Sequence, residues 1–165
     1  MEPAADSKEH AIEFRQITGR DGIEDVRQLF MEYAQAIETD LSFQNFEEEL
    51  RALPGKYGPP SGALILALVD GGAAGCAALH KLSETVCEMK RLYVRPCCGG
   101  LGIGRKLVNL VMEAASSMNY QYIRLDTLPT MKAAQSLYAS LGFYDIAPYV
   151  YNPIEGTRYM ELKLK

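Results

Sequence analysis

A run of small residues between Gly99 and Gly104 is the feature of this 165-residue chain with the most evident chemical use. It reads Gly-Gly-Leu-Gly-Ile-Gly and lies between a strand pattern that ends at Val94 and a strong helical pattern. Unpaired N–H groups at a helix start point outward, the helix dipole adds partial positive charge, and glycine lets a phosphate approach the backbone. Because Arg105 and Lys106 follow directly, the run is a candidate anion-binding helix start.

Two other phosphate-binding motifs do not fit these residues. A dinucleotide fingerprint that starts at Gly102 needs glycine where the chain has Leu107. A Walker motif that ends at Gly104 needs lysine and then Ser or Thr, whereas Arg105 and Lys106 follow. Taken alone, the run is as compatible with a flexible turn at the end of a strand as with a phosphate site.

Composition narrows the class of protein. With 48% hydrophobic and 23% charged residues, the chain can bury one core, and we expect a single domain over residues 1–165 with a loose tail at 1–9. A net charge of -4 argues against nucleic-acid binding. No apolar run is long enough to span a membrane, and the start lacks a secretory signal, so we expect a cytoplasmic protein. The cysteine spacing suggests neither a metal site nor a disulfide framework.

Regular elements on both sides must hold the glycine run in place. Helical spacing of apolar residues predicts helices at 21–37, 42–53, 103–118 and 130–141. Alternating or continuous apolar segments predict strands at 11–17, 63–69, 73–82, 85–94, 122–127 and 157–163. Asp21 and Ser42 are expected caps, Asp70 with the next two glycines a hairpin turn, and residues 54–62 an exposed loop. This order predicts an α+β fold, with a mixed, mainly antiparallel twisted sheet of six to seven strands and helices on both faces.

Two segments together resemble a known family. The stretch from Glu88 to Leu107, EMKRLYVRPCCGGLGIGRKL, resembles the signature motif of the GNAT (Gcn5-related N-acetyltransferase) superfamily. The stretch from Ala134 to Phe143, AQSLYASLGF, is similar to that family's later helix and strand, with Tyr138 four residues before the Gly-Phe pair. The resemblance implies a GNAT-like acyl-CoA N-acyltransferase fold, acetyl-CoA as cofactor, and direct transfer to an amine without a covalent enzyme intermediate. Homodimers are common in that superfamily, although the sequence specifies no interface.

The resemblance assigns the cofactor to two stretches of backbone. The first is to pair with the pantetheine arm like an added strand, and comprises Leu92, Tyr93 and Val94. The second is to hold the pyrophosphate through its amides, and comprises Gly99, Gly100, Leu101, Gly102, Ile103, Gly104 and Arg105. The N–H of Leu92 is also assigned to the thioester oxygen, where negative charge grows during attack. The chain departs from the family at Gly99, where Arg or Gln is usual, and at Met131, where Asn is common.

Tyr138 matches the residue that protonates the departing thiolate in the family. A phenol suits that step because its reference pKa, near 10, lies above that of a thiol, near 8.5. The alternative is that Tyr138 only packs between Ala134 and Leu141 on one helical face. Cys97 and Cys98 are interpreted as spacers, since direct transfer needs no nucleophilic enzyme group.

Glu88 is the candidate general base, because it lies eleven residues before Gly99, as in the histone-acetylating branch of the superfamily. That role requires burial to raise its pKa from an ordinary value near 4.3. Alternatively, Glu88 is a solvated charge or a partner for Lys90 or Arg91. His80 on the preceding strand is the rival base.

The resemblance implies that the acceptor is a primary amine of a small molecule or a peptide. The sequence does not show which of the two it is. Three tyrosines ahead of the last strand either stack on the acceptor or cover the sheet: Tyr144, Tyr149 and Tyr151. The alternatives are a non-catalytic acetyl-CoA sensor and a transferase of a longer acyl group.

Overall fold

The computed structural model of the protein describes residues 9–37, 41 and 45–164. The strands are β1 (Ile12–Gln16), β2 (Ala63–Val69), β3 (Gly72–Lys81), β4 (Val86–Val94), β5 (Tyr122–Thr127), β6 (Tyr144–Ile146) and β7 (Arg158–Lys163). The helices are α1 (Ile23–Ala36), α2 (Phe46–Ala52), α3 (Ile103–Ser117) and α4 (Lys132–Ser140). Within the described ranges, no helix is long and apolar enough to cross a membrane.

The strands form one seven-stranded sheet in the order β1-β2-β3-β4-β5-β7-β6. β4 and β5 run parallel, and the other neighbouring strands run antiparallel. This arrangement confirms the predicted mixed, mainly antiparallel sheet. The short strand β6 was not placed by the sequence, because three residues are too few to show an alternating pattern.

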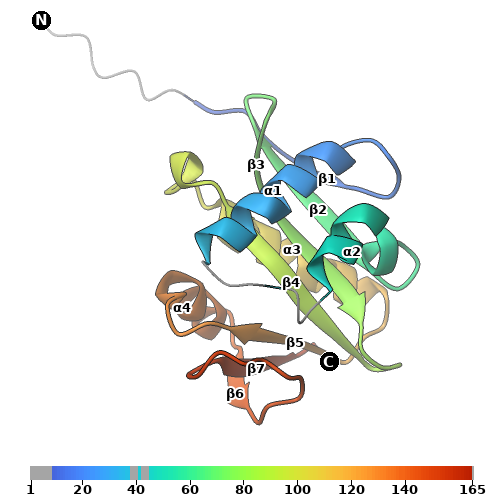
Figure 1. Ribbon diagram of the computed structural model, residues 1–165, viewed down its shortest axis with the longest axis vertical. Coiled ribbons are helices and arrows are strands. Elements are labelled where there is room, and N and C mark those ends of the chain that lie inside the picture. Colours follow the sequence, from blue (N-terminus) through green and yellow to red (C-terminus); the bar gives the residue numbers. More distant parts are fainter. Residues whose placement is uncertain (1–8, 38–40, 42–44, 165) are drawn as a thin grey trace, which may run out of the picture.

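Helices cover both faces of the sheet, as predicted (Figure 1). On one face, α1 buries Val26, Leu29 and Phe30 against β2 and β3. On the other face, α3 buries Leu107 and Val111, and α4 adds its own apolar side chains to the same cluster. The sheet is therefore the middle of three layers, and its central strands are buried on both sides.

Local turn chemistry accounts for most of the element boundaries. Asp70 and Gly71 have φ of 50° and 84°, which is the pair of positive values that a two-residue hairpin between β2 and β3 requires. Asp21 does not cap α1: the N-cap is Gly22 at φ 84°, without a side-chain hydrogen bond. The expected cap at Ser42 lies outside the described residues.

The prediction of a wholly exposed loop at 54–62 is wrong in one respect. Residues Gly55–Tyr57 form a 3-10 turn, and the Tyr57 side chain is fully buried between α1 and the sheet. Its ring makes edge contacts with Phe30 and His80, and its hydroxyl donates a 2.7 Å hydrogen bond to Glu49. The many prolines and glycines correctly indicate an irregular backbone. They do not indicate that the Tyr57 side chain packs into the core.

Candidate active site

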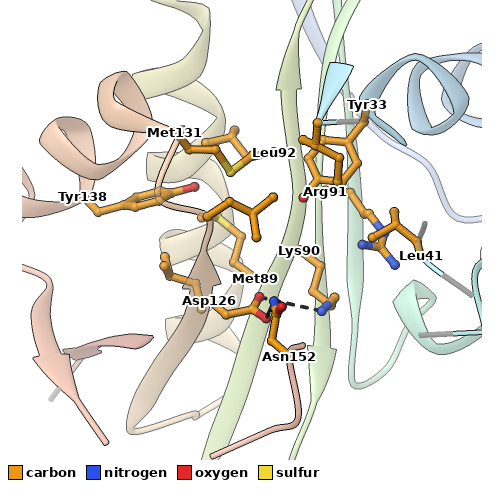
Figure 2. A pocket seen from close by; sticks show the side chains of 13 residues that line it. Tyr33, Leu41, Met89, Lys90, Arg91, Leu92, Asp126, Met131, Tyr138 and Asn152 are labelled. Atoms are coloured by element: carbon orange, nitrogen blue, oxygen red, sulfur yellow. Dashed lines mark hydrogen bonds and ion pairs between the residues drawn. The ribbon is translucent and has the colours of Figure 1, made fainter. Parts of the chain in front are cut away.

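The sheet opens between β4 and β5, which creates the candidate site. The two strands pair only from Val86 to Glu88 on β4, and β4 continues to Val94 paired with β3 alone. The open wedge between them, here called the β4–β5 split, leads into a pocket that encloses about 560 Å³, including space open to solvent. Figure 2 shows side chains from β4, β5 and α4 meeting there. A backbone edge without a neighbouring strand can pair with an extended ligand.

A β-bulge in β4 shapes one wall of this pocket. Arg91 and Leu92 together stand opposite the single residue Ala77 of β3, and Arg91 has φ of 61°. Such a bulge turns neighbouring side chains to new directions. Leu92 lines the pocket, and the Arg91 guanidinium reaches α2, where it donates to Glu49 at 2.8 and 3.2 Å.

The glycine run, residues 99–105, is called the glycine loop below and leads from the end of β4 into α3. Gly100 and Gly102 have φ of 78° and 75°, and a Cβ at either position would meet no atom within 4 Å. Gly102 is the N-cap of α3, and among the described residues no side chain caps this end. The first helical bond runs from Lys106 N to the Gly102 carbonyl, so the amides from Gly100 to Arg105 remain available for an anion. The Gly99 N–H, which the resemblance also assigned to the pyrophosphate, already donates to the Pro96 carbonyl at 3.2 Å.

Of the other cofactor positions that the sequence indicated, Tyr93 faces away from the glycine loop. Its hydroxyl donates a weak 3.4 Å hydrogen bond to Glu32, and its ring contacts Tyr33 of α1. Val94 lies on the opposite face beside Gly104. The resemblance assigns the backbone of these residues, not their side chains, to the pantetheine arm. The directions of the side chains therefore do not test that assignment.

Tyr138 of α4 lines the same pocket as Leu92 and Met131. Its side chain is 6% exposed, its ring packs against Phe143, and Figure 2 shows the hydroxyl directed from α4 towards β4. No hydrogen bond joins this hydroxyl to any described residue. Burial raises the pKa of Tyr138, which keeps the hydroxyl protonated at neutral pH.

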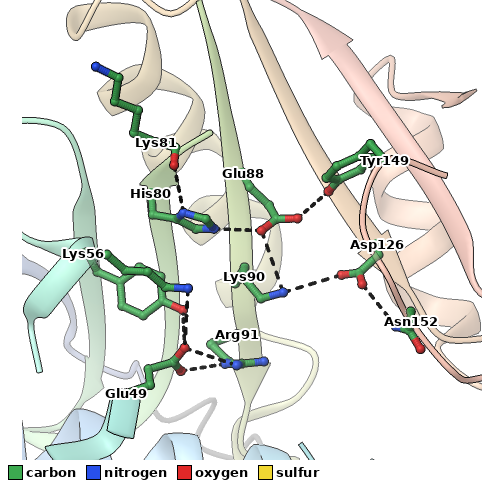
Figure 3. Close-up of polar contacts among 11 residues, drawn as sticks. Glu49, Lys56, His80, Lys81, Glu88, Lys90, Arg91, Asp126, Tyr149 and Asn152 are labelled. Carbon is green, nitrogen blue, oxygen red and sulfur yellow. Dashed lines mark hydrogen bonds and ion pairs between the residues drawn. The ribbon is translucent and has the colours of Figure 1, made fainter. Parts of the chain in front are cut away.

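Glu88 is buried at the point where β4 and β5 part. Its two oxygens accept hydrogen bonds from His80 Nε2 at 2.7 Å and from the Tyr149 hydroxyl at 2.5 Å (Figure 3). Burial acts to raise its pKa, but the bond from His80, the charge of Lys90 and the bond from Tyr149 outweigh burial and lower the pKa to about 2. The raised pKa that a general base requires is therefore not found for Glu88.

His80, the rival base, is held by Glu88 itself. Its Nδ1 lies 3.1 Å from the Lys81 carbonyl oxygen, which can only accept, so Nδ1 carries a hydrogen. Its Nε2 lies 2.7 Å from the Glu88 carboxylate. Both ring nitrogens therefore already contact groups of the protein, and neither is left to contact an incoming amine.

Sequence reasoning missed Asp126 and gave Lys90 only the part of a partner for Glu88, yet both line the pocket. The Lys90 Nζ lies 3.8 Å from Glu88 and 3.9 Å from Asp126, and Asn152 donates to Asp126 at 3.1 Å (Figure 3). The sequence signal was an acidic residue near the end of β5, between the buried residues Leu125 and Thr127. We call the side chains on this face the polar layer, and its members are His80, Glu88, Lys90, Asp126, Tyr149 and Asn152. His80 and Glu88 are buried, and the other four residues are partly buried.

The three C-terminal tyrosines do not form one cluster. Tyr149 reaches Glu88 and packs on Tyr159, whereas Tyr144 lies on β6 and donates to Glu161 at 2.5 Å. Tyr151 is 76% exposed. Only Tyr149 therefore belongs to the polar layer.

These features fit acetyl-CoA. The uncapped amides of the glycine loop suit a pyrophosphate, and the unpaired edge of β4 suits an arm that contains amide groups. The buried hydroxyl of Tyr138 suits a group that develops negative charge.

Comparison with known proteins agrees with this geometry. The profile of the Acetyltransferase (GNAT) family matches residues 23–143. An N-acetyltransferase of Schizosaccharomyces pombe is 42% identical over 144 residues, covering 86% of this chain and 88% of the relative. Human N-acetylaspartate synthetase is 37% identical over 87 residues, or 52% of this chain and 28% of the relative.

A solved structure shares the fold. An N-acetyltransferase from Thermoplasma acidophilum in complex with coenzyme A superposes with a TM-score of 0.70 at 17% identity, over 93% of this chain and 99% of the other. The chain therefore belongs to the acetyltransferase (GNAT) family and is an N-acetyltransferase that uses acetyl-CoA as its acyl donor.

Proposed function

We propose that the protein transfers the acetyl group directly to a primary amine of a small molecule or a peptide, with Tyr138 as the acid. The observation that carries this proposal is the buried Tyr138 hydroxyl, which has no hydrogen-bond partner among the described residues and is directed into the pocket at the β4–β5 split. A buried hydroxyl without a partner is costly, so its retention calls for a use.

Backbone groups hold the donor in this proposal. The β4 edge from Leu92 to Val94 pairs with the pantetheine arm, and the amides from Gly100 to Arg105 hold the pyrophosphate, since the Gly99 N–H already donates to the Pro96 carbonyl. Bound acetyl-CoA supplies an activated thioester. Because main-chain donors are fixed by the fold, they need little reorganisation when charge develops.

Tyr138 donates its proton to the thiolate that leaves when the neutral amine attacks. The proton that the amine nitrogen loses as the amide forms then restores the phenol, directly or through water. The raised pKa of the buried phenol keeps that proton in place until negative charge appears nearby. A role in packing alone would use the ring and not the hydroxyl, so the two interpretations differ in what a phenylalanine does at this position.

Glu88 is better assigned a positioning role than the base role. Its oxygens are engaged by His80 and Tyr149, and its pKa is lowered to about 2, which makes it a weak proton acceptor near neutrality. In this position it fixes the Tyr149 loop and places a negative charge beside Lys90.

The related N-acetylaspartate synthetase carries an acetylated amino acid in its name, which favours a small-molecule acceptor over a peptide. Screening tests the proposal: purified protein and acetyl-CoA are combined with amino acids, diamines, amino sugars and peptides, and release of free thiol is followed. We expect release above background with at least one amine. Cofactor binding without release for any amine would instead indicate an acetyl-CoA sensor.

A further inference from the structure

Lys90 is a buried cation whose charge partners are too distant for hydrogen bonds. Its side chain is 9% exposed, and its two acidic neighbours lie at 3.8 and 3.9 Å. Hydrogen bonds of the N–H···O type span about 2.7–3.2 Å, so no described residue accepts from this ammonium at that distance. A buried ammonium without acceptors is costly, and Lys90 lies in the wall of the pocket.

Asp126 lies next to Lys90 and has one carboxylate oxygen without a hydrogen-bond donor among the described residues. Its side chain is 12% exposed, and one oxygen accepts from Asn152 at 3.1 Å. Among the described residues, the other oxygen has Lys90 as its charge partner, at 3.9 Å, and accepts no hydrogen bond. Both oxygens of Glu88 already accept short hydrogen bonds. Asp126 is therefore the carboxylate of the polar layer that can still accept hydrogen bonds from a ligand in the pocket.

The pocket wall thus places a cation that has no acceptor among the described residues 3.9 Å from a carboxylate oxygen that accepts no hydrogen bond from them. A ligand with an ammonium and a carboxylate on one carbon atom would satisfy both groups at once. We infer that the acceptor is a free α-amino acid, its ammonium held by Asp126 and its carboxylate by Lys90. This inference rests on the proposed function and narrows its substrate class.

Other amines fit this charge pattern less well. A peptide N-terminus or an amino acid amide has a neutral carbonyl in place of the carboxylate, so its contact with Lys90 is a hydrogen bond without the ion pair. A diamine brings a second cation towards Lys90, which repels it. The expected order of kcat/KM is therefore amino acid, then amino acid amide, then diamine.

The experiment compares each amino acid with its own amide on the full-length protein, with acetyl-CoA and thiol release as the readout. We expect the kcat/KM of the best amino acid to exceed that of its amide at least tenfold, since a polar site discriminates against an analogue that leaves it unpaired. A ratio near one would overturn the inference and leave the proposed function standing. No release with any amine would overturn both.

Substitution of Lys90 tests whether its ammonium binds the carboxylate of the acceptor or only neutralises the charges of Glu88 and Asp126. Lys90→Met keeps the length and the apolar stem but removes the charge. We expect the amino acid to amide ratio to collapse towards one, through KM for the amino acid, and Lys163→Met, an exposed control on β7, to keep the wild-type ratio. If Lys90→Met keeps the wild-type ratio, Lys90 does not bind the acceptor.

Asp126→Asn has the same shape and can retain a contact to Asn152. We expect it to weaken kcat/KM for every amine about tenfold or more, with the dissociation constant of acetyl-CoA unchanged. An equal loss in cofactor affinity would show that the change acts on the fold instead. If either variant fails to fold, the wild-type ratio of amino acid to amide decides the inference by itself.

Discussion

The glycine loop and the polar layer serve the two ends of one reaction, and they are made of different kinds of group. The glycine loop presents main-chain amides at the surface, beside two glycines with open space where a Cβ would stand. The polar layer consists of charged, polar and aromatic side chains that contact one another and are buried or partly buried between the sheet and the C-terminal loop (Figure 3). Tyr138 lies in the pocket that Lys90 and Asp126 of the polar layer also line.

Because of this difference, the two regions should be sensitive to different kinds of substitution. A cradle of amides depends on backbone conformation, so steric and φ requirements decide its function. A buried charge network depends on every partner being present, because an unpaired charge in the interior costs several kcal/mol. Side-chain charge should therefore matter greatly in the polar layer and little in the glycine loop.

The largest expected effect is on stability in the polar layer. Glu88→Gln removes the anion that faces His80 and Lys90, and we expect the free energy of unfolding at pH 7 to fall by about 3–5 kcal/mol. Urea unfolding measures it. The matched control is Glu84→Gln, because Glu84 pairs with Lys81 on the surface, where solvent screens the pair and its loss should leave the stability nearly unchanged. Equal effects of the two changes would contradict the contrast.

The contribution of Glu88 to stability should also depend on pH, in a direction that its lowered pKa predicts. The pKa of Glu88 is lowered from 4.5 to about 2 in the folded protein, so its contribution is complete above about pH 4.5 and is lost as the pH falls towards 2. That contribution is on the order of 3 kcal/mol. We expect the stability of the wild type to decline more steeply over this interval than that of Glu88→Gln, and parallel declines would argue against it.

The next largest effect is on the rate, where the two regions meet. Tyr138→Phe should lower kcat about a hundredfold, as expected for loss of a general acid, with acetyl-CoA affinity and stability nearly unchanged because the hydroxyl has no described partner. Tyr57→Phe is the control: its hydroxyl bonds to Glu49, so it should lose about 1 kcal/mol of stability and no rate. An unchanged kcat in Tyr138→Phe would return this residue to a role in packing.

The two regions also differ in how far the sequence could predict them. The glycine loop is continuous, and each of its requirements, from positive φ at Gly102 to a helix start at Ile103, depends on neighbouring residues. The strands and helices could be placed for the same reason. The polar layer joins Glu88 to residues 8 and 61 positions away, and Asp126 to a residue 26 positions away. Such contacts depend on strand order, on the bulge at Arg91 and on the split of β4 from β5, none of which local spacing reveals.

A smaller effect is expected for strain in the glycine loop. Gly102→Val places a β-branched residue at φ 75° at the start of α3, where the distorted amides should bind acetyl-CoA about tenfold more weakly, as calorimetry would measure. Gly71→Val is the matched control, since Gly71 also has positive φ, at 84°, and open surroundings. Both variants should lose similar stability, and a loss of affinity in both would mean that strain acts through the whole fold.

The smallest effect should come from the side chain in the glycine loop that carries charge. Arg105 donates at 2.9 Å to Ser140 on the surface, and its amide, not its guanidinium, belongs to the proposed cradle. Arg105→Ala should therefore weaken acetyl-CoA binding only by a factor of about two to five at low salt, with the difference fading as salt rises. A larger loss that persists at high salt would mean that the guanidinium itself holds a phosphate. The glycine loop would then depend on side-chain charge as the polar layer does, and the proposed division between backbone and side-chain recognition would fail.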